Sequence, residues 1–210
     1  MELQLILSFL LASMALTFMP GPDNIYVLTE SLARGAKTGI LISIGLISGI
    51  MVHTAAAATG ISLIIQQSAG LFNVIKYLGA AYLFYLAYQA YKERPIKVDS
   101  DFSSGVVETR SHWQLIRTGF FMNVLNPKVS LFFLALLPQF ITSDGIWIPT
   151  QMIILGGIFM IQGIIIFCMI AWLAGKLNTY LSKPSFWTTT KWIKIGVLSI
   201  LGITLLLAKK

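Results

Sequence analysis

The chain has 210 residues, of which 56% are hydrophobic and only 11% are charged, so it is not an ordinary soluble domain but an all-α integral membrane protein. Its formal net charge is +7, but the basic residues gather in predicted loops, which argues against a nucleic-acid partner and for surrounding membrane lipid. The one cysteine, Cys168, lies inside an apolar run, which excludes a disulfide framework, a CxxC redox pair and a thiolate metal site.

Charge-free apolar windows predict six membrane helices, since a helix needs roughly 20 apolar residues to cross the hydrocarbon core. The hydrophilic segment 92–112 is expected to be a cytoplasmic linker that divides a single transmembrane domain, 1–210, into a first repeat, 1–91, and a second, 113–210. The expected helices are 3–29 (interrupted at Pro20 to Pro22), 39–64, 69–91, 115–138, 146–175 and 191–208.

Basic residues predict the orientation of this bundle, because Lys and Arg accumulate in cytoplasmic loops. Eleven of them follow the first helix, flank the linker or lie between the fifth and sixth helices, and three fall on the other side: Lys76, Lys209 and Lys210. Both termini are therefore predicted to lie outside the cell. A re-entrant first helix would move only the N-terminus.

Three helices in each half give the second half the opposite polarity in the membrane, which is the geometry of an inverted repeat. Asn126, Pro127 and Lys128 interrupt the fourth helix much as Pro20 to Asp23 interrupt the first. The sequence therefore predicts two inverted three-helix repeats with broken helices at corresponding positions. Paired breaks of this kind point to a transport site.

The two breaks are predicted to be polar sites inside the membrane. Pro20 and Pro22 lack N–H groups and leave the carbonyls of Leu16 and Phe18 without their usual helical partners, while Gly21 permits a sharp bend. New half-helices are expected to begin near Pro22 and, with Asn126 as N-cap, at Pro127, and their positive ends suit an anion. Each break could alternatively be a structural kink, but two breaks beside charged residues favour a site.

Lys128 is expected well inside the membrane, where a lysine needs a partner or a task, and Asp23 is the natural counter-charge. Snorkelling of Lys128 and a plain N-cap role for Asp23 are the structural alternatives. Asp23, Tyr26 and Glu30 share one helical face, which predicts a polar track toward the cytoplasmic end. Asp23 and Glu30 are candidates for proton coupling, although Glu30 is also readily explained as an interface residue.

The predicted second helix carries Gly45, Gly49, His53, Ala56 and Gly60 at spacings of three and four, a stripe that allows close helix packing. His53 is therefore expected to face protein. It is a candidate proton carrier because an imidazole titrates near neutrality, but a hydrogen-bonded packing role is favoured. A similar stripe in the fifth helix contains Gly156 and Gly163, and these stripes could serve packing within one chain or in a homodimer.

Three segments resemble the lysine exporter and homoserine/threonine resistance family (LysE/RhtB): "PGPDNIYVLTESLARGAKTG", "YLGAAYLFYLAYQAYKE" and "GFFMNVLNPKVSLFFLALLPQF". The resemblance implies a multi-pass protein of the bacterial inner membrane with periplasmic termini. It also implies export of a small-molecule substrate, an amino acid or close derivative, driven by the proton-motive force. The matching motif positions are Pro20, Gly21, Pro22, Asn126, Pro127 and Lys128. Ala87 departs from the pattern, where a glycine is expected.

Other functions fit the residues less well. An inorganic cation exporter would need more acids or His and Cys clusters than Asp23 and Glu30 supply, so no metal site is predicted. A membrane enzyme would need a nucleophile or an acid–base pair at recognisable spacing, which Ser43, Ser48 and His53 do not form. No catalytic residue and no cofactor are predicted. A non-catalytic membrane protein would leave the two charged breaks unexplained.

Overall fold

The computed structural model describes residues 2–61, 69–92, 111–143, 145–181 and 184–207. Every regular element in these ranges is helical, which confirms the all-α prediction. The elements are α1 (Leu3–Phe18), α2 (Pro22–Arg34), α3 (Ala36–Ala56), η1 (Ala57–Ile61), α5 (Ala69–Lys92), α6 (His112–Val124), α7 (Pro127–Leu131), η2 (Phe132–Leu136), η3 (Leu137–Phe140), α8 (Ile148–Leu181) and α9 (Pro184–Leu207).

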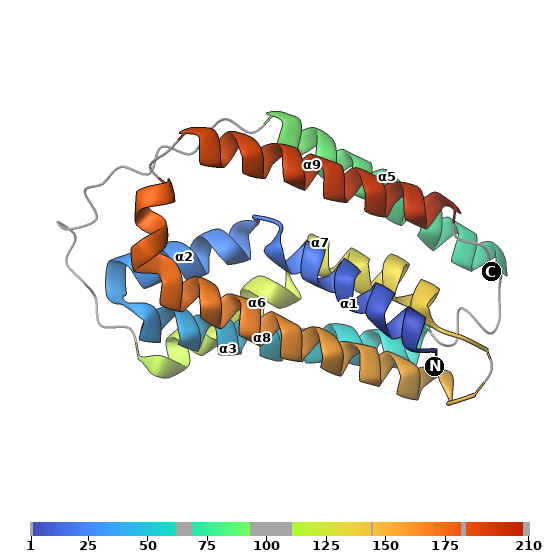
Figure 1. Ribbon diagram of the computed structural model, residues 1–210. Coiled ribbons are helices and arrows are strands. Elements are labelled where there is room, and N and C mark those ends of the chain that lie inside the picture. Colours follow the sequence, from blue (N-terminus) through green and yellow to red (C-terminus); the bar gives the residue numbers. More distant parts are fainter. Residues whose placement is uncertain (1, 62–68, 93–110, 144, 182–183, 208–210) are drawn as a thin grey trace.

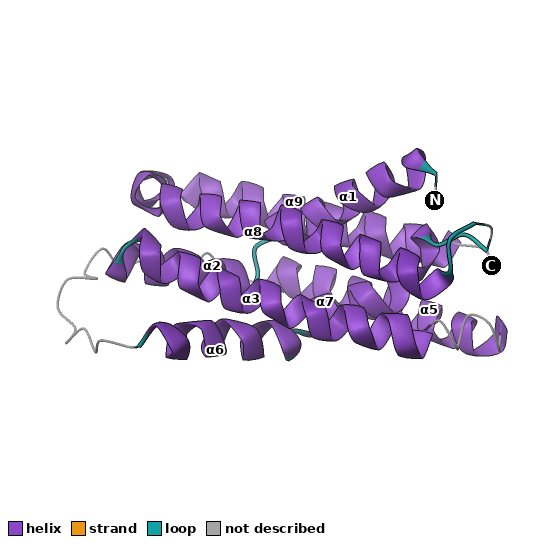
Figure 2. Ribbon diagram, turned by 90° about the horizontal axis from the view of Figure 1, so that it is seen from below, coloured by secondary structure: helices purple, strands orange, loops and turns teal. Residues whose placement is uncertain are grey.

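The helices form an elongated bundle in which the N-terminal part of α1 and the C-terminal part of α9 lie at the same end (Figure 1). α5 and α9 pack against each other and make up the upper edge of Figure 1. On the other side α3 packs against both α6 and α8, and Figure 2 shows α3 and α6 side by side. The two termini thus share one end of the bundle, which the predicted topology requires.

Two helical segments are long and apolar enough to cross a membrane, Ala36–Gly60 and Ile148–Ala174. Two bent pairs reach the same length together: α1 with α2, bent by 56°, and α6 with the segment Pro127–Phe140, bent by 48°. The described part of the chain therefore has two to four candidate spans. The predicted breaks are confirmed at both positions, whereas six spans are not established, because α5 and α9 are not among these candidates.

Several helices begin or end at other residues than predicted, because capping residues set their ends. α6 begins at His112, three residues early, because Ser111 and Gln114 form a capping box. α2 continues to Arg34 and stops at Gly35, whose φ of 88° favours glycine. α9 begins at Pro184, and a proline is favoured in the first turn of a helix. The predicted residues 62–64 and 208 and most of the linker, 93–110, lie outside the described residues.

An apolar core of phenylalanine rings joins α1, η2 and α8. Phe9 and Phe132 are almost completely buried, and their ring centroids lie 5.7 Å apart. Phe159 on α8 stands edge-on to Phe132 at 5.4 Å, and Phe140 meets Phe9 at 5.3 Å. Aromatic pairs in these geometries stabilise a core beyond their buried area. Along α1 this cluster precedes the break, on the side of the termini.

Glycines allow α3 to approach both α6 and α8 closely. A Cβ added at Gly45 would overlap the backbone carbonyl of Ile116, and one added at Gly119 would overlap that of Ile42. In α8, a Cβ at Gly156 would overlap the Thr54 side chain. At Gly45, Gly119 and Gly156 the close packing is therefore between helices of one chain.

The predicted stripe on α3 was wrong at its C-terminal end. Ala56 and Gly60 are exposed, and no atom of the described residues lies within 4 Å of a Cβ added at Gly60. The buried positions are instead Ala57 and Ala58. The helix widens to a π-helix from Ala57, so a repeat counted in steps of three and four no longer follows its inner face.

Replacing Gly45 with alanine should destabilise the protein by about 1–3 kcal/mol, because α3 and α6 must move apart to admit the methyl group. Gly157→Ala is the matched control, since Gly157 lies in α8 with nothing within 4 Å of the added Cβ. Thermal unfolding of the purified proteins in detergent checks this. Equal melting temperatures for the two variants would contradict the close packing.

Candidate functional site

The first break separates α1 from α2. α1 ends at Phe18, and α2 begins at Pro22 with Gly21 as its N-cap residue. Asp23 is therefore the second residue of α2, where the partial positive charge of the helix N-terminus favours a carboxylate. Its side chain is only 3% exposed. The break thus holds an acidic group inside the bundle.

The second break repeats this arrangement with a basic residue. Asn126 is the N-cap of α7, and its Oδ1 accepts a hydrogen bond from the backbone N–H of Lys128 at 3.0 Å. Pro127 is the first residue of α7, and Lys128 is the second. N-cap, proline and charged residue thus follow each other in the same order at both breaks, with opposite charges in the third place.

The two breaks meet inside the bundle. Asn126 Nδ2 donates a hydrogen bond of 2.6 Å to Asp23 Oδ2, across 103 positions of the sequence, and both side chains are buried. The Lys128 charge attracts the Asp23 carboxylate electrostatically. The structure therefore brings together four of the predicted site residues, which are Gly21, Asp23, Asn126 and Lys128.

Lys128 reaches from the second break to the end of α1. Its ammonium donates hydrogen bonds to the backbone carbonyls of Leu16 and Met19, each at 3.3 Å. A Cβ added at Gly21 would lie 3.2 Å from Lys128 Nζ, so the ammonium packs directly against the Gly21 backbone. The last carbonyls of a helix carry partial negative charge, and here they hold a cation.

The Leu16 carbonyl, which the sequence predicts to lose its helical partner at Pro20, accepts a hydrogen bond from Lys128 instead. The Thr17 carbonyl is also taken, by the side-chain amide of Asn24 at 2.8 Å. The prediction counted only carbonyls that face a proline four residues later. Since α1 stops at Phe18, the carbonyls of its whole last turn are released, and neighbouring side chains bind two of them.

Thr17 is the centre of a hydrogen-bond chain that sequence reasoning missed. Its hydroxyl donates to the Ser13 carbonyl at 2.8 Å and accepts from Gln162 Nε2 on α8 at 2.9 Å. Thr17 and Gln162 are both buried. A glutamine inside the apolar run of α8 was the available signal, because polar residues at such positions usually face protein.

The polar atoms left over around the breaks are hydrogen-bond acceptors. Within the described residues, the buried side-chain oxygens near the breaks that have no hydrogen-bond partner are Asp23 Oδ1, Asn24 Oδ1, Asn123 Oδ1 and Gln162 Oε1. Buried polar atoms are normally paired, so such a group of acceptors calls for a donor-rich partner. An ammonium group, with three N–H donors and a positive charge, has that chemistry.

Replacing Thr17 with valine should destabilise the protein by about 1–3 kcal/mol, because the buried Gln162 amide loses its acceptor while the side-chain shape is kept. Thr204→Val is the matched control, since Thr204 makes the same bond to a carbonyl four residues earlier but is exposed. The check is thermal unfolding in detergent. A Thr17 variant as stable as the Thr204 variant would show that the chain to Gln162 contributes nothing.

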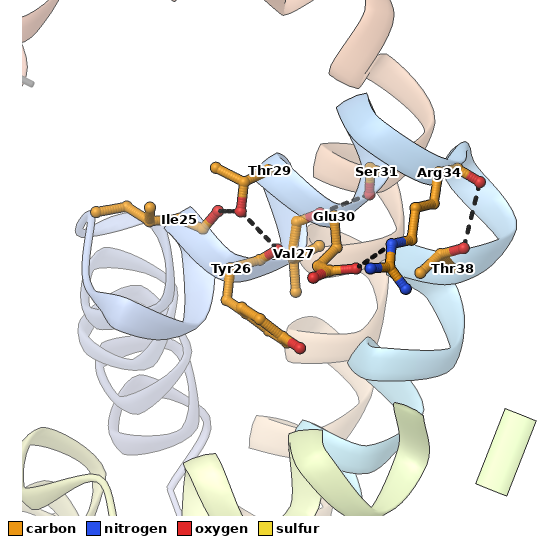
Figure 3. Close-up of polar contacts among 8 residues, drawn as sticks. All are labelled: Ile25, Tyr26, Val27, Thr29, Glu30, Ser31, Arg34 and Thr38. Atoms are coloured by element: carbon orange, nitrogen blue, oxygen red, sulfur yellow. Dashed lines mark hydrogen bonds and ion pairs between the residues drawn. The ribbon is translucent and has the colours of Figure 1, made fainter. Parts of the chain in front are cut away.

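Tyr26 and Glu30 lie farther along α2 and project from the same side of it (Figure 3). Glu30 forms an ion pair with Arg34, with 3.3 Å between Glu30 Oε2 and Arg34 Nε. Hydroxyls of Thr29, Ser31 and Thr38 bond to carbonyls of the preceding turn. Glu30 is therefore engaged by Arg34, four residues later in α2.

His53 is buried, as the stripe on α3 predicted. Its Nε2 lies 3.2 Å from the backbone carbonyl of Asn123, one turn before the second break. Its ring also lies 5.8 Å from that of Phe133. Gln162 approaches the first break from α8 much as His53 approaches the second from α3. In the described part of the chain, no three His, Cys, Asp or Glu side chains are grouped to hold a metal ion.

Comparison with known proteins gives one family and several relatives. Residues 14–209 match the model of the family described as LysE type translocator. An uncharacterized membrane protein of Vibrio cholerae is 31% identical over 189 residues, covering 90% of this chain and 89% of that protein. The uncharacterized membrane protein YrhP of Bacillus subtilis is 30% identical over 186 residues, covering 86% of this chain and 88% of its own.

Relatives with a named function are more distant. The homoserine/homoserine lactone efflux protein of Salmonella typhimurium is 28% identical over 178 residues, covering 84% of each chain. The leucine efflux protein of an Enterobacter strain is 26% identical over 148 residues, covering 70% of this chain and 69% of that one. No solved structure matches the chain.

Proposed function

Because the chain belongs to the LysE type translocator family, whose members are membrane transporters and not enzymes, we propose that it is a secondary exporter of amino acids or close derivatives. Relatives are named as efflux proteins for leucine and for homoserine and its lactone: leucine and homoserine are amino acids, and the lactone is a close derivative whose carboxyl group is closed into an ester. The observation that carries the proposal is the contact between the two breaks. It brings a buried carboxylate, one of whose oxygens has no hydrogen-bond partner among the described residues, near an ammonium group, where lipid would tolerate neither charge alone.

The proposed substrate site lies at this contact and is formed by Pro20, Gly21, Pro22, Asp23, Tyr26, Asn126, Pro127 and Lys128. The ammonium of the amino acid pairs with Asp23 and with carbonyls at the end of α1. The carboxylate pairs with Lys128 at the N-terminus of α7. Two opposite charges at a fixed separation select a zwitterion over a molecule with one charge.

The proposed architecture is a single domain, 1–210, of six membrane-spanning segments in two inverted repeats. Three features support it. Both breaks have the same order of N-cap, proline and charged residue. In each proposed repeat the second helix packs against the broken helix of the other repeat: α3 packs against α6, and α8 packs against α1 and α2. Both termini lie at one end of the bundle. Basic residues then favour periplasmic termini in a bacterial inner membrane. Alternating access comes from rocking of the two repeats around the site.

The proposed energy source is the proton-motive force, with Asp23, His53 and Glu30 as candidates for the coupled proton. Asp23 is favoured because it is buried at the contact between the breaks, where a charge change alters the interaction with Lys128. The phenylalanine cluster of Phe9, Phe132, Phe140 and Phe159 lies between this contact and the end with the termini. In the proposed orientation this cluster closes the substrate site toward the periplasm.

Efflux from cells preloaded with labelled amino acids by dipeptide feeding tests this function. Cells that produce the protein should lose one or a few amino acids faster than cells with an empty vector, across a set of neutral, basic and hydroxylated amino acids. Equal efflux from both for every amino acid would overturn the proposal. In proteoliposomes, flux that does not respond to an imposed pH gradient would overturn proton coupling alone.

A further inference from the structure

The end of α1 holds an ammonium group that belongs to the protein itself. Lys128 Nζ donates to the carbonyls of Leu16 and Met19 and lies against the Gly21 backbone. These carbonyls are the negative pole of α1, the place that the electrostatics of the break assign to a cation. The protein thus uses one of its own side chains as the cation at this position.

The Asp23 carboxylate beside this position is only partly satisfied. It is 3% exposed, and Oδ2 accepts from Asn126. Its other oxygen, Oδ1, is buried without a hydrogen-bond partner in the described residues. An ammonium group that enters between Asp23 and the end of α1 therefore finds an unused acceptor on the carboxylate and two carbonyls that Lys128 can give up.

We propose that Lys128 is a tethered stand-in for the substrate's ammonium group and thereby makes the site selective for zwitterions. The inference rests on the function proposed above and adds how the site discriminates. The substrate's ammonium displaces that of Lys128 from the carbonyls of Leu16 and Met19. The substrate's carboxylate then pairs with the displaced Lys128 at the N-terminus of α7, so every charge keeps a partner.

A primary amine without a carboxylate cannot complete this exchange. It could displace Lys128 from the carbonyls, but the lysine charge would then be left inside the bundle with no anion to receive it. Leaving the half-buried Lys128 charge unpaired is unfavourable, and the expected discrimination against such amines is on the order of 100-fold in affinity. In a variant with an uncharged residue at position 128, an amine displaces no charge from the carbonyls. It therefore needs no carboxylate to bind.

A purely structural role for Lys128 predicts something else. If Lys128 only caps the last turn of α1, its replacement lowers the stability of the protein. The ratio between the affinity for an amino acid and the affinity for the corresponding amine then stays unchanged. The ratio therefore separates the two roles, because a change in folding affects both ligands alike.

The test compares affinities of purified protein in detergent for pairs of ligands that differ only in the carboxylate: L-leucine with 3-methylbutylamine and L-homoserine with 3-amino-1-propanol. Binding is followed by thermal stabilisation at increasing ligand concentration. Wild type should prefer the amino acid of a pair by about 100-fold. In Lys128→Met the amine should bind at least as tightly as the amino acid, and more tightly than it binds wild type.

Two further variants keep this test decisive. Lys92→Met makes the same change at an exposed lysine near the Tyr88 ring and should keep the wild-type preference. Lys128→Gln serves if the methionine variant does not fold, because its amide can still donate to one carbonyl at the end of α1. It should also gain amine binding.

The inference is overturned if neither uncharged Lys128 variant binds amines better than wild type does. This outcome is distinct from failure of the proposed function, which shows as an absence of amino-acid efflux from cells that produce wild type. Amine binding by the variants is measured on purified protein and not through export. It therefore decides the role of Lys128 whether or not the protein exports amino acids.

Discussion

Replacing Asp23 with asparagine is expected to lower amino-acid export by about 100-fold or more. The asparagine oxygen can still accept the hydrogen bond from Asn126, so the contact between the two breaks keeps its shape. What is lost is the negative charge that interacts with Lys128, and with it the carboxylate proposed to receive the substrate's ammonium. The charge left without its partner is that of the half-buried Lys128, which costs up to about 3–5 kcal/mol, and each 1.4 kcal/mol is a factor of ten.

Efflux rates at matched amounts of protein in the membrane measure this effect. Glu2→Gln is the control, because it makes the same chemical change at an exposed residue ahead of α1. It should export like wild type. An Asp23→Asn variant that exports as fast as Glu2→Gln would remove Asp23 from the site.

Replacing Asn126 with alanine is expected to destabilise the protein by about 2–5 kcal/mol and to abolish export. The substitution removes an N-cap, which costs about 0.5–2 kcal/mol, and leaves the Asp23 carboxylate without its hydrogen-bond donor, which costs about 1–3 kcal/mol. It also removes the hydrogen bond that joins side chains of the two breaks. The half-helix α7 then loses its fixed position against α2.

Ser111→Ala is the matched control for Asn126. Ser111 caps α6 through a hydrogen bond from the backbone N–H of Gln114, at an exposed position. Its replacement removes a cap alone and should cost only about 1 kcal/mol. Melting temperatures in detergent should differ by several degrees, because 1 kcal/mol shifts a protein of this size by about 2–4 °C. Equal melting temperatures and equal export would show that the bond to Asp23 is dispensable.

The positions of both breaks could be predicted from the sequence because they depend on local chemistry. A proline lacks an N–H wherever it stands, and an asparagine before a proline is a good start for a helix. Pro22 and Pro127 accordingly begin α2 and α7. The charges at Asp23 and Lys128 were conspicuous for the same kind of reason, since each lies in an apolar stretch.

Contacts between helices could not be predicted in the same way. Gln162 bonds to Thr17 and Lys128 bonds to Leu16 and Met19 because of how the helices are rotated and shifted against each other, which no periodicity within one helix reports. The π-helix that begins at Ala57 rotates the inner face of its helix, so the predicted stripe was lost at Gly60. Local chemistry thus located the breaks, and tertiary packing decided their partners.

The two breaks together form the proposed amino-acid site. The most direct test is efflux of labelled amino acids from preloaded cells that carry an empty vector, wild type, Lys128→Ala or Lys37→Ala at matched abundance. Lys37 is exposed at the start of α3 and serves as the control. The account predicts selective efflux from wild type and Lys37→Ala, with Lys128→Ala reduced to the level of the vector. Wild-type efflux from Lys128→Ala would contradict it.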